Sequence, residues 1–172
     1  MFLSYIKDFS LKKLLKNSYQ TLKNNQSVNP IKSVGLLIDN NYFLNKDDLI
    51  SELIANGFSK NQIKVLIFKE KSDVNDVVNY LTLSYKNISW NGNFTKQNIS
   101  EFIEEKFDLL INYYDVEKPV LMLITNKSEA SFKVGFSNVD KRCNDLMINT
   151  NVENYKVFVF ELFKYLKILK KI

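Results

Sequence analysis

Histidine is absent from this sequence, and cysteine and arginine each occur once. Without histidine, the chain has no Ser-His-Asp or Cys-His catalysis and no histidine ligand for a metal. A general acid or base would have to be Asp, Glu, Lys, Tyr or Cys. We therefore predict no catalytic residue, no metal and no cofactor, and we interpret the chain as a binding protein more readily than as an enzyme.

A single cysteine, Cys143, excludes an intrachain disulfide and a thiolate metal cluster, which fits the reducing cytoplasm. Lys141 and Arg142 beside it would favour a reactive thiolate, but with no histidine partner we interpret Cys143 as a packing residue. Only four glycines are present, and none forms a glycine-rich phosphate loop. The first 16 residues are interrupted by charges, and no apolar run approaches the roughly 18 residues of a membrane span, so we predict a cytoplasmic protein.

Long apolar runs alternate with helical patterns along the chain. Four runs are typical of buried parallel strands, at residues 31–39, 62–68, 107–114 and 132–136. Segments 46–56 and 119–125 between them predict crossover helices. The fold class that follows is α/β, with a single doubly wound, mostly parallel sheet of about five strands, flavodoxin- or Rossmann-like, and helices at both ends. We favour a flavodoxin-like strand order.

Two domains are predicted: a basic amphipathic helical segment at residues 1–30, and an α/β domain at residues 31–172 that ends in a long basic helix. Local signals predict further detail. The predicted features are a short helix at 71–81, a third strand at Tyr85–Trp90 and a helix end at Gly57. The predicted N-caps are Asn45, Asn98 and Thr150, and the last two form capping boxes with Glu101 and Glu153.

Polar residues follow three of the predicted strands. In open α/β sheets, ligands bind beyond the carboxyl ends of the strands, so these residues predict a ligand site. Carboxylates near an arginine would suit a phosphorylated or hydroxylated ligand, although Asp and Asn also end strands simply because they suit turns. The candidate ligand-binding residues are Asp39, Asn40, Asn112, Asp115, Ser137, Asp140, Lys141 and Arg142.

Two weaker patterns have an ordinary structural interpretation beside a functional one. Asp39 and Asp115 would offer oxygen ligands to Mg²⁺, but solvated turn residues are the simpler interpretation. Trp90, with Tyr85 and Phe94, would stack a nucleic-acid base, but aromatic residues at alternating positions more often pack in the core.

Positive charge is concentrated at the two ends of the chain. Residues 1–33 carry six lysines and one aspartate, residues 154–172 carry five lysines and one glutamate, and the middle is mildly acidic. If the two terminal helices lie together, they form one basic face for polyanions such as RNA. The amphipathic helices would also allow peripheral membrane contact, or simply present a solvated surface. The candidate polyanion-binding residues are Lys12, Lys13, Lys16, Lys23, Lys164, Lys167, Lys170 and Lys171.

The segments at Phe107–Tyr114 and Phe132–Ser137, with the closing FELFKYLKILKKI, resemble a family of short uncharacterised bacterial proteins that has no assigned activity. A shorter stretch, Phe107–Asn112 with Lys133–Phe136, resembles the N-terminal Rossmann-like domain of heptosyltransferase-type glycosyltransferases. That resemblance implies a nucleotide or sugar-phosphate ligand. From the length of the chain, we expect no second, nucleotide-sugar domain of the kind those enzymes have.

The sequence therefore leaves two hypotheses. The first is a binding or adaptor protein that engages RNA, a ribonucleoprotein or an acidic protein through its basic terminal helices. The alternative is a diminished glycosyltransferase-like domain that binds a nucleotide or sugar phosphate at the carboxyl edge of its sheet. A self-associating scaffold is a third possibility that the sequence leaves open.

Overall fold

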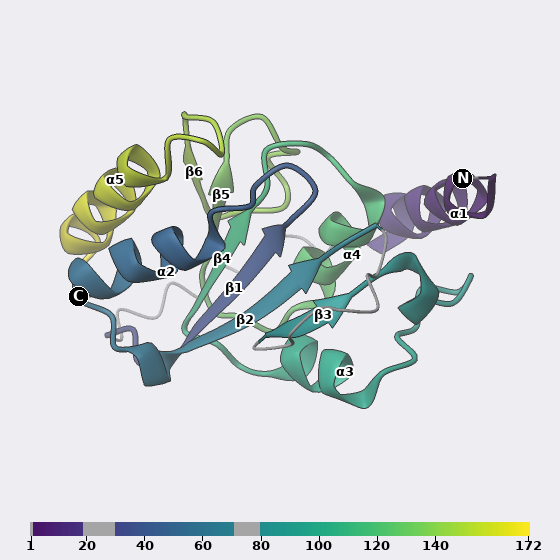
Figure 1. Ribbon diagram of the computed structural model, residues 1–172, viewed down its shortest axis with the longest axis horizontal. Helices are drawn as coiled ribbons and strands as arrows, with labels where there is room; N and C mark the ends of the chain where they lie inside the picture. The colour runs from purple at the N-terminus through teal and green to yellow at the C-terminus, as the bar shows by residue number, and fades with distance from the viewer. Residues whose placement is uncertain (1, 19–29, 71–79) are drawn as a thin grey trace.

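The computed structural model describes residues 2–18, 30–70 and 80–172, and these residues form a six-stranded sheet flanked by helices (Figure 1). Each strand pairs with its neighbours in parallel. The prediction of one parallel α/β sheet is confirmed, with six strands where about five were expected. The strands are β1 (Val34–Asp39), β2 (Ile63–Phe68), β3 (Leu81–Leu83), β4 (Leu109–Tyr113), β5 (Lys133–Phe136) and β6 (Leu146–Ile148).

The strand order is β3-β2-β1-β4-β5-β6, which is the Rossmann order and not the flavodoxin-like order that we favoured. The chain starts in the middle of the sheet, builds outward to β3, and then returns to place β4 on the other side of β1. The two orders differ in the place of the third strand, because β3 pairs with β2 here, whereas the third strand of the flavodoxin-like order pairs with β1. That leaves the other side of β1 to β4, and the apolar pattern of a strand does not specify its neighbour.

Helices cover both faces of the sheet. They are α1 (Phe2–Ser18), α2 (Lys46–Ala55), α3 (Gln97–Glu104), α4 (Pro119–Lys127) and α5 (Tyr155–Ile168), with short 3₁₀ helices at Lys60–Gln62 and Tyr85–Asn87. Helices α2 and α5 pack on one face, and α1, α3 and α4 pack on the other. No helix in the described part of the chain is both long and apolar enough to cross a membrane.

Strand β1 is the centre of the core because all six of its residues are buried. Successive side chains of a strand point to opposite faces. Leu36 and Ile38 therefore join the cluster under α2 and α5, and Leu37 joins the cluster under α3 and α4. Burial on both faces explains why this strand is a continuous apolar run in the sequence.

Several local predictions are wrong. Tyr85–Trp90 begins with a 3₁₀ helix, and the third strand lies earlier, at Leu81–Leu83. Asn98 and Thr150 do not cap helices, because α3 follows Lys96 and α5 follows Asn154. The predicted helix at 71–81 lies almost wholly outside the described residues.

Two predictions at the ends of α2 are confirmed. Asn45 is the N-cap residue, although its side chain makes no capping hydrogen bond. Gly57 has a φ of 135°, in the region that favours glycine, and it directly follows Asn56, the C-cap residue of the helix.

Candidate functional site

The strand order reverses between β1 and β4, and the carboxyl ends of these two strands define the position where ligands bind in open α/β sheets. Asp39 ends β1 there, and Asp115 and Lys118 follow β4. The loops after both strands therefore bring their polar residues to one place, which we call the switch-point cluster. It consists of Asp39, Asn40, Asn41, Tyr42 and Lys118, together with Glu70 from the loop after the neighbouring β2.

Lys118 is the centre of the switch-point cluster. Its Nζ lies 2.9 Å from Asp39 Oδ2 and 2.8 Å from Glu70 Oε1. The side chains of Lys118 and Asp39 are only 9% and 3% exposed. The same Nζ lies 4.6 Å from the centre of the Tyr42 ring. A charge this buried requires partners, and Lys118 has two carboxylates and an aromatic face.

The loop after β1 folds back on itself. Asp39 Oδ1 accepts a hydrogen bond from the backbone N–H of Asn41, and Asn41 Oδ1 accepts one from the backbone N–H of Glu70. Phe43 then enters the core, with its ring 4.8 Å from that of Tyr113. In Asn40, the buried Oδ1 has no hydrogen-bond partner among the described residues.

This loop does not resemble a phosphate cradle. It contains no glycine, and the first turn of α2 carries Asp47 and Asp48, whose charges oppose an anion at that helix N-terminus. Lys118, the cation of the cluster, already contacts two carboxylates. The electrostatics of the switch point therefore disfavour a phosphate or nucleotide ligand.

The eight predicted ligand-binding residues fall into three groups in the structure. Asp39 and Asn40 lie in the switch-point cluster, and Asp115 is nearby, where it accepts a hydrogen bond from the backbone N–H of Val152. The others lie elsewhere, and their role as a ligand site stays a prediction. They are Asn112, which is buried beneath α4, and Ser137, Asp140, Lys141 and Arg142 in the loop after β5.

Arg142 and Asp140 form an ion pair within that loop. The Nη2 atom of Arg142 lies 2.5 Å from Asp140 Oδ2, and its Nε also donates to the same carboxylate. The backbone N–H of Asp140 donates to Glu117 Oε1. The single arginine is thus neutralised by a neighbour two residues away, so it contributes little net charge for holding an anion.

Asn112 belongs to a chain of buried hydrogen bonds that the sequence did not indicate. Its Nδ2 donates to Asn144 Oδ1 at 2.7 Å, and its Oδ1 accepts from Thr125 Oγ1 at 2.8 Å. Tyr114 extends the chain through its hydroxyl, 2.8 Å from Thr125 Oγ1. These side chains join β4 to α4 and to the segment after β5, so they have a structural role.

The other candidates from the sequence are Cys143, Trp90 and a metal site. Cys143 is buried, as its interpretation as a packing residue predicts. Trp90 is 46% exposed, so its expected place in the core is wrong. Nowhere in residues 2–18, 30–70 and 80–172 do three or more Cys, Asp or Glu side chains gather in a way that would hold a metal ion.

The two basic helices lie on opposite faces of the sheet, because α1 packs against α4 while α5 packs beside α2 (Figure 1). The two helices therefore do not lie together, which was the condition for a single basic face, and polyanion binding by their lysines stays a prediction. Lys171 is buried, with its Nζ 4.7 Å from the centre of the Phe132 ring, and Lys164 pairs with Glu161. Lys12, Lys13 and Lys16 are exposed on α1, and Lys23 lies outside the described residues.

Comparison with known protein families matches residues 7–169 to DUF6913, a family of unknown function. The chain belongs to the DUF6913 family. The resemblance to an uncharacterised family is thereby confirmed over nearly the whole sequence. No curated protein and no solved structure matched the chain, so the similarity to heptosyltransferase-type glycosyltransferases has no support from these comparisons.

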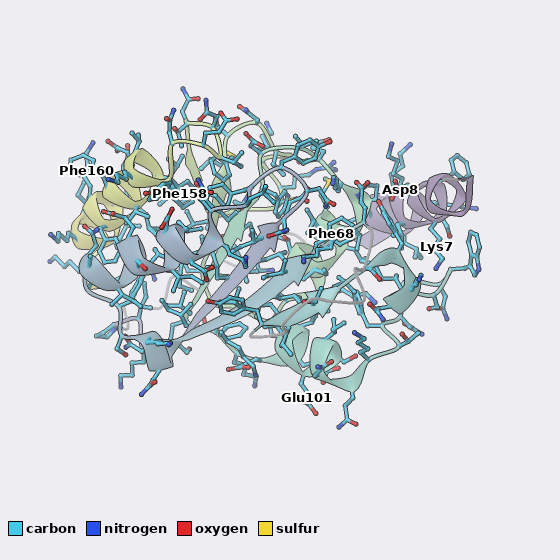
Figure 2. All side chains as sticks on the ribbon, in the orientation of Figure 1. Lys7, Asp8, Phe68, Glu101, Phe158 and Phe160 are labelled. Atoms are coloured by element: carbon cyan, nitrogen blue, oxygen red, sulfur yellow. The ribbon has the colours of Figure 1, made fainter. Side chains whose placement is uncertain are left out.

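In this DUF6913 chain, α5 presents apolar side chains to solvent as well as to the core. Phe158, Val159, Leu162, Phe163 and Leu166 are buried. On the other side, Val157 is 49% exposed and Phe160 and Ile168 are each 64% exposed. Figure 2 shows Phe158 directed inward and Phe160 directed away from the sheet. We call Val157, Phe160 and Ile168 the outer ridge of α5.

Helix α1 is joined to the rest of the DUF6913 domain by polar contacts near the switch point. Lys7 Nζ donates to the carbonyls of Tyr85 and Ile88 at 2.8 Å, and Ser10 Oγ donates to the carbonyl of Trp90. The Tyr85 hydroxyl donates to Asp8 at 3.0 Å. Burial and the neighbouring Asp8 carboxylate raise the pKa of Tyr85, so its hydroxyl remains a donor.

We predict that Asp8→Asn raises the free energy of unfolding at neutral pH. Burial raises the pKa of the Asp8 carboxyl above 3.8, and the hydrogen bond from Tyr85 offsets only part of this effect. A carboxyl with a raised pKa in the folded state holds its proton more tightly there than in the unfolded chain. Ionisation above that pKa therefore costs stability, and the cost disappears as the pH falls below 3.8.

Asparagine keeps an oxygen acceptor for Tyr85 and carries no charge. Urea titrations of both proteins between pH 7 and pH 3.5 measure the difference. The advantage of Asp8→Asn should shrink steadily as the pH falls. An advantage that grows on acidification would contradict the prediction.

Lys118, Glu70 and Asp8 are the residues that sequence reasoning missed. Each comes from a different part of the chain, and they meet only because β1, β2 and β4 are neighbours and α1 lies over their carboxyl ends. One signal was available for Lys118, because Pro119 marks a helix start and a residue just before it lies at the carboxyl edge of the sheet.

Proposed function

We propose that this protein is a non-catalytic binding protein, an adaptor that engages an anionic macromolecule through α5. One observation carries the proposal. The outer ridge of α5 is apolar and exposed, and four exposed lysines accompany it against a single glutamate, Glu161. These lysines are Lys156, Lys164, Lys167 and Lys170.

The switch-point cluster is a weaker basis for function. Lys118 contacts two carboxylates, and Arg142 pairs with Asp140. The described residues there present more acceptors than unopposed cations. This distribution of charge supports a structural role for the cluster and leaves α5 as the stronger binding surface.

The packing of α5 also suits a binding platform. Five side chains of the helix are buried against β-strands and α2, so the exposed side is held rigidly. Helix α1 also carries three exposed lysines, but its described buried anchors are only Leu11 and Leu15. A rigid surface loses less conformational entropy on binding.

We predict that the triple variant Lys156→Glu, Lys167→Glu and Lys170→Glu binds immobilised heparin about 10- to 100-fold more weakly than the wild type at low salt. Each reversed charge should cost roughly 0.5–1 kcal/mol of binding free energy. Three of them add to roughly 1.5–3 kcal/mol, which corresponds to a loss of affinity of about one to two orders of magnitude. Retention should also fall steeply as salt rises, because counterions compete with the lysines.

The matched control is Lys12→Glu, Lys13→Glu and Lys16→Glu on α1. It changes the net charge by the same amount on the opposite face. This control should retain most of the binding. Equal losses for both triple variants, or no retention of the wild type at low salt, would contradict the proposal.

A further inference from the structure

The outer ridge follows the spacing of a helix that packs against another helix. Val157, Lys164 and Ile168 are separated by seven and four residues, and Phe160 lies within one turn of Val157. Positions with these spacings lie along one side of a helix. The side chains on this line are apolar except for Lys164 and its partner Glu161.

Lysines surround the apolar ridge. Phe160 has Lys156 four residues before it and Lys164 four residues after it, and Lys167 is one further turn along. Residues four apart are neighbours on a helix surface, so the exposed phenylalanine lies among cations. The surface therefore combines an apolar centre with a positive border.

This combination identifies the chemistry of the partner. Nucleic acid does not suit the centre, because aliphatic Val157 and Ile168 neither stack on bases nor pair with phosphates. Arginine is absent from α5, since the only arginine is Arg142 in the loop after β5. A second copy of this chain does not suit the border, because in a two-fold contact the same lysines would face one another.

We propose that an acidic amphipathic α-helix of a protein partner lies along α5. Its apolar side packs on Val157, Phe160 and Ile168, and its Asp and Glu side chains pair with Lys156 and Lys167 at the border of the ridge. The mode is that of a helix recognised by anchors at i, i+3/4 and i+7. This inference rests on the proposed function and specifies the class of partner for the same surface.

The test begins with photo-crosslinking. Phe160 is replaced by p-benzoylphenylalanine, which keeps an apolar aromatic side chain on the ridge, in cells that produce the protein. Irradiation followed by peptide mass spectrometry identifies what contacts position 160. The expected product is a protein segment with apolar residues at helical spacing and an excess of Asp and Glu. Crosslinks to nucleic acid, to lipid, to a second copy or to a segment without that pattern would overturn the inference.

A second measurement uses a synthetic peptide of the crosslinked segment. The double variant Phe160→Ser and Ile168→Ser should bind this peptide at least tenfold more weakly than the wild type while binding heparin equally well. The control is Phe9→Ser, at a side chain of α1 that is 75% exposed, because α1 and α5 lie on opposite faces of the sheet. It should leave both affinities unchanged.

The outcomes separate the two proposals. If the lysines are needed for heparin but the serine variant binds the peptide normally, the helical partner is wrong and the anionic one stands. If the lysines of α5 are not needed either, both proposals fail. Thermal unfolding of each variant confirms that the fold is intact, which is expected because the changed side chains are exposed.

Discussion

Replacing Lys118 with methionine is expected to lower the free energy of unfolding by about 3–5 kcal/mol. The variant keeps much of the aliphatic stem and removes only the ammonium group. It leaves Asp39, which is 2% exposed, without its cation, and a buried unpaired carboxylate is among the most costly features that a core can contain. Urea unfolding at pH 7, followed by circular dichroism, measures the loss.

Two further variants isolate the cause. Asp39→Asn combined with Lys118→Met removes both charges, so it should cost clearly less than the sum of the two single changes. Lys164→Met breaks the exposed ion pair with Glu161 and should cost far less, because water screens the charges of an exposed pair. A Lys118→Met variant as stable as Lys164→Met would show that the switch-point cluster does not stabilise the fold.

Gly135→Ala is expected to destabilise the protein by about 2–5 kcal/mol, the sum of an overpacking cost and the loss of a buried hydrogen bond. A Cβ atom at position 135 would lie 2.5 Å from Asn144 Nδ2 and 2.9 Å from Asn144 Oδ1. The amide of Asn144 must then move, and its hydrogen bond from Asn112 is lost. Equilibrium unfolding in urea checks the value.

A double-mutant cycle distinguishes this cause from a general intolerance of β5 to side chains. Asn144→Ala empties the space that the new Cβ requires, although it leaves Asn112 without its acceptor. Gly135→Ala should therefore cost much less in the Asn144→Ala background than in the wild type. Simple additivity of the two changes would show that the contact with Asn144 is not the reason glycine is needed.

Both predictions concern parts of the fold that bring distant segments together. The Lys118 cluster holds the loops after β1, β2 and β4 at the carboxyl edge, and the Asn112 chain holds β4, α4 and the segment after β5. Their polar groups are mostly directed at one another.

The central strands were predictable because burial on both faces requires a long apolar run. Segments near residues 34, 65, 109 and 134 all proved to be parallel neighbours. The edge strands β3 and β6 contain three residues each, too few for a periodic pattern. Two of the three predicted N-caps, Asn98 and Thr150, failed for a related reason, because several Ser, Thr and Asn residues compete for each helix start and packing selects among them.

Among the candidate ligand residues, the sequence predicted local positions correctly but did not predict contacts between distant segments. The sequence located Asp39 and Asp115 at strand ends, which is a local property. Asn112 lies only one position before the end of β4, but alternation directs its side chain under α4 and not toward the carboxyl edge. Lys118 was missed because its partners, Asp39 and Glu70, are far away in the chain.

Composition and local pattern by themselves determined the fold class, the two lysine-rich ends and the absence of histidine chemistry, since each depends on residue types and short-range periodicity. The tertiary structure decided which segments are in contact and on which face of the sheet each helix packs. The pairing of β4 with β1 brought Lys118 to Asp39, and the path of the chain placed α1 and α5 on opposite faces. Such pairings depend on contacts between segments far apart in sequence, and no single segment encodes its neighbour.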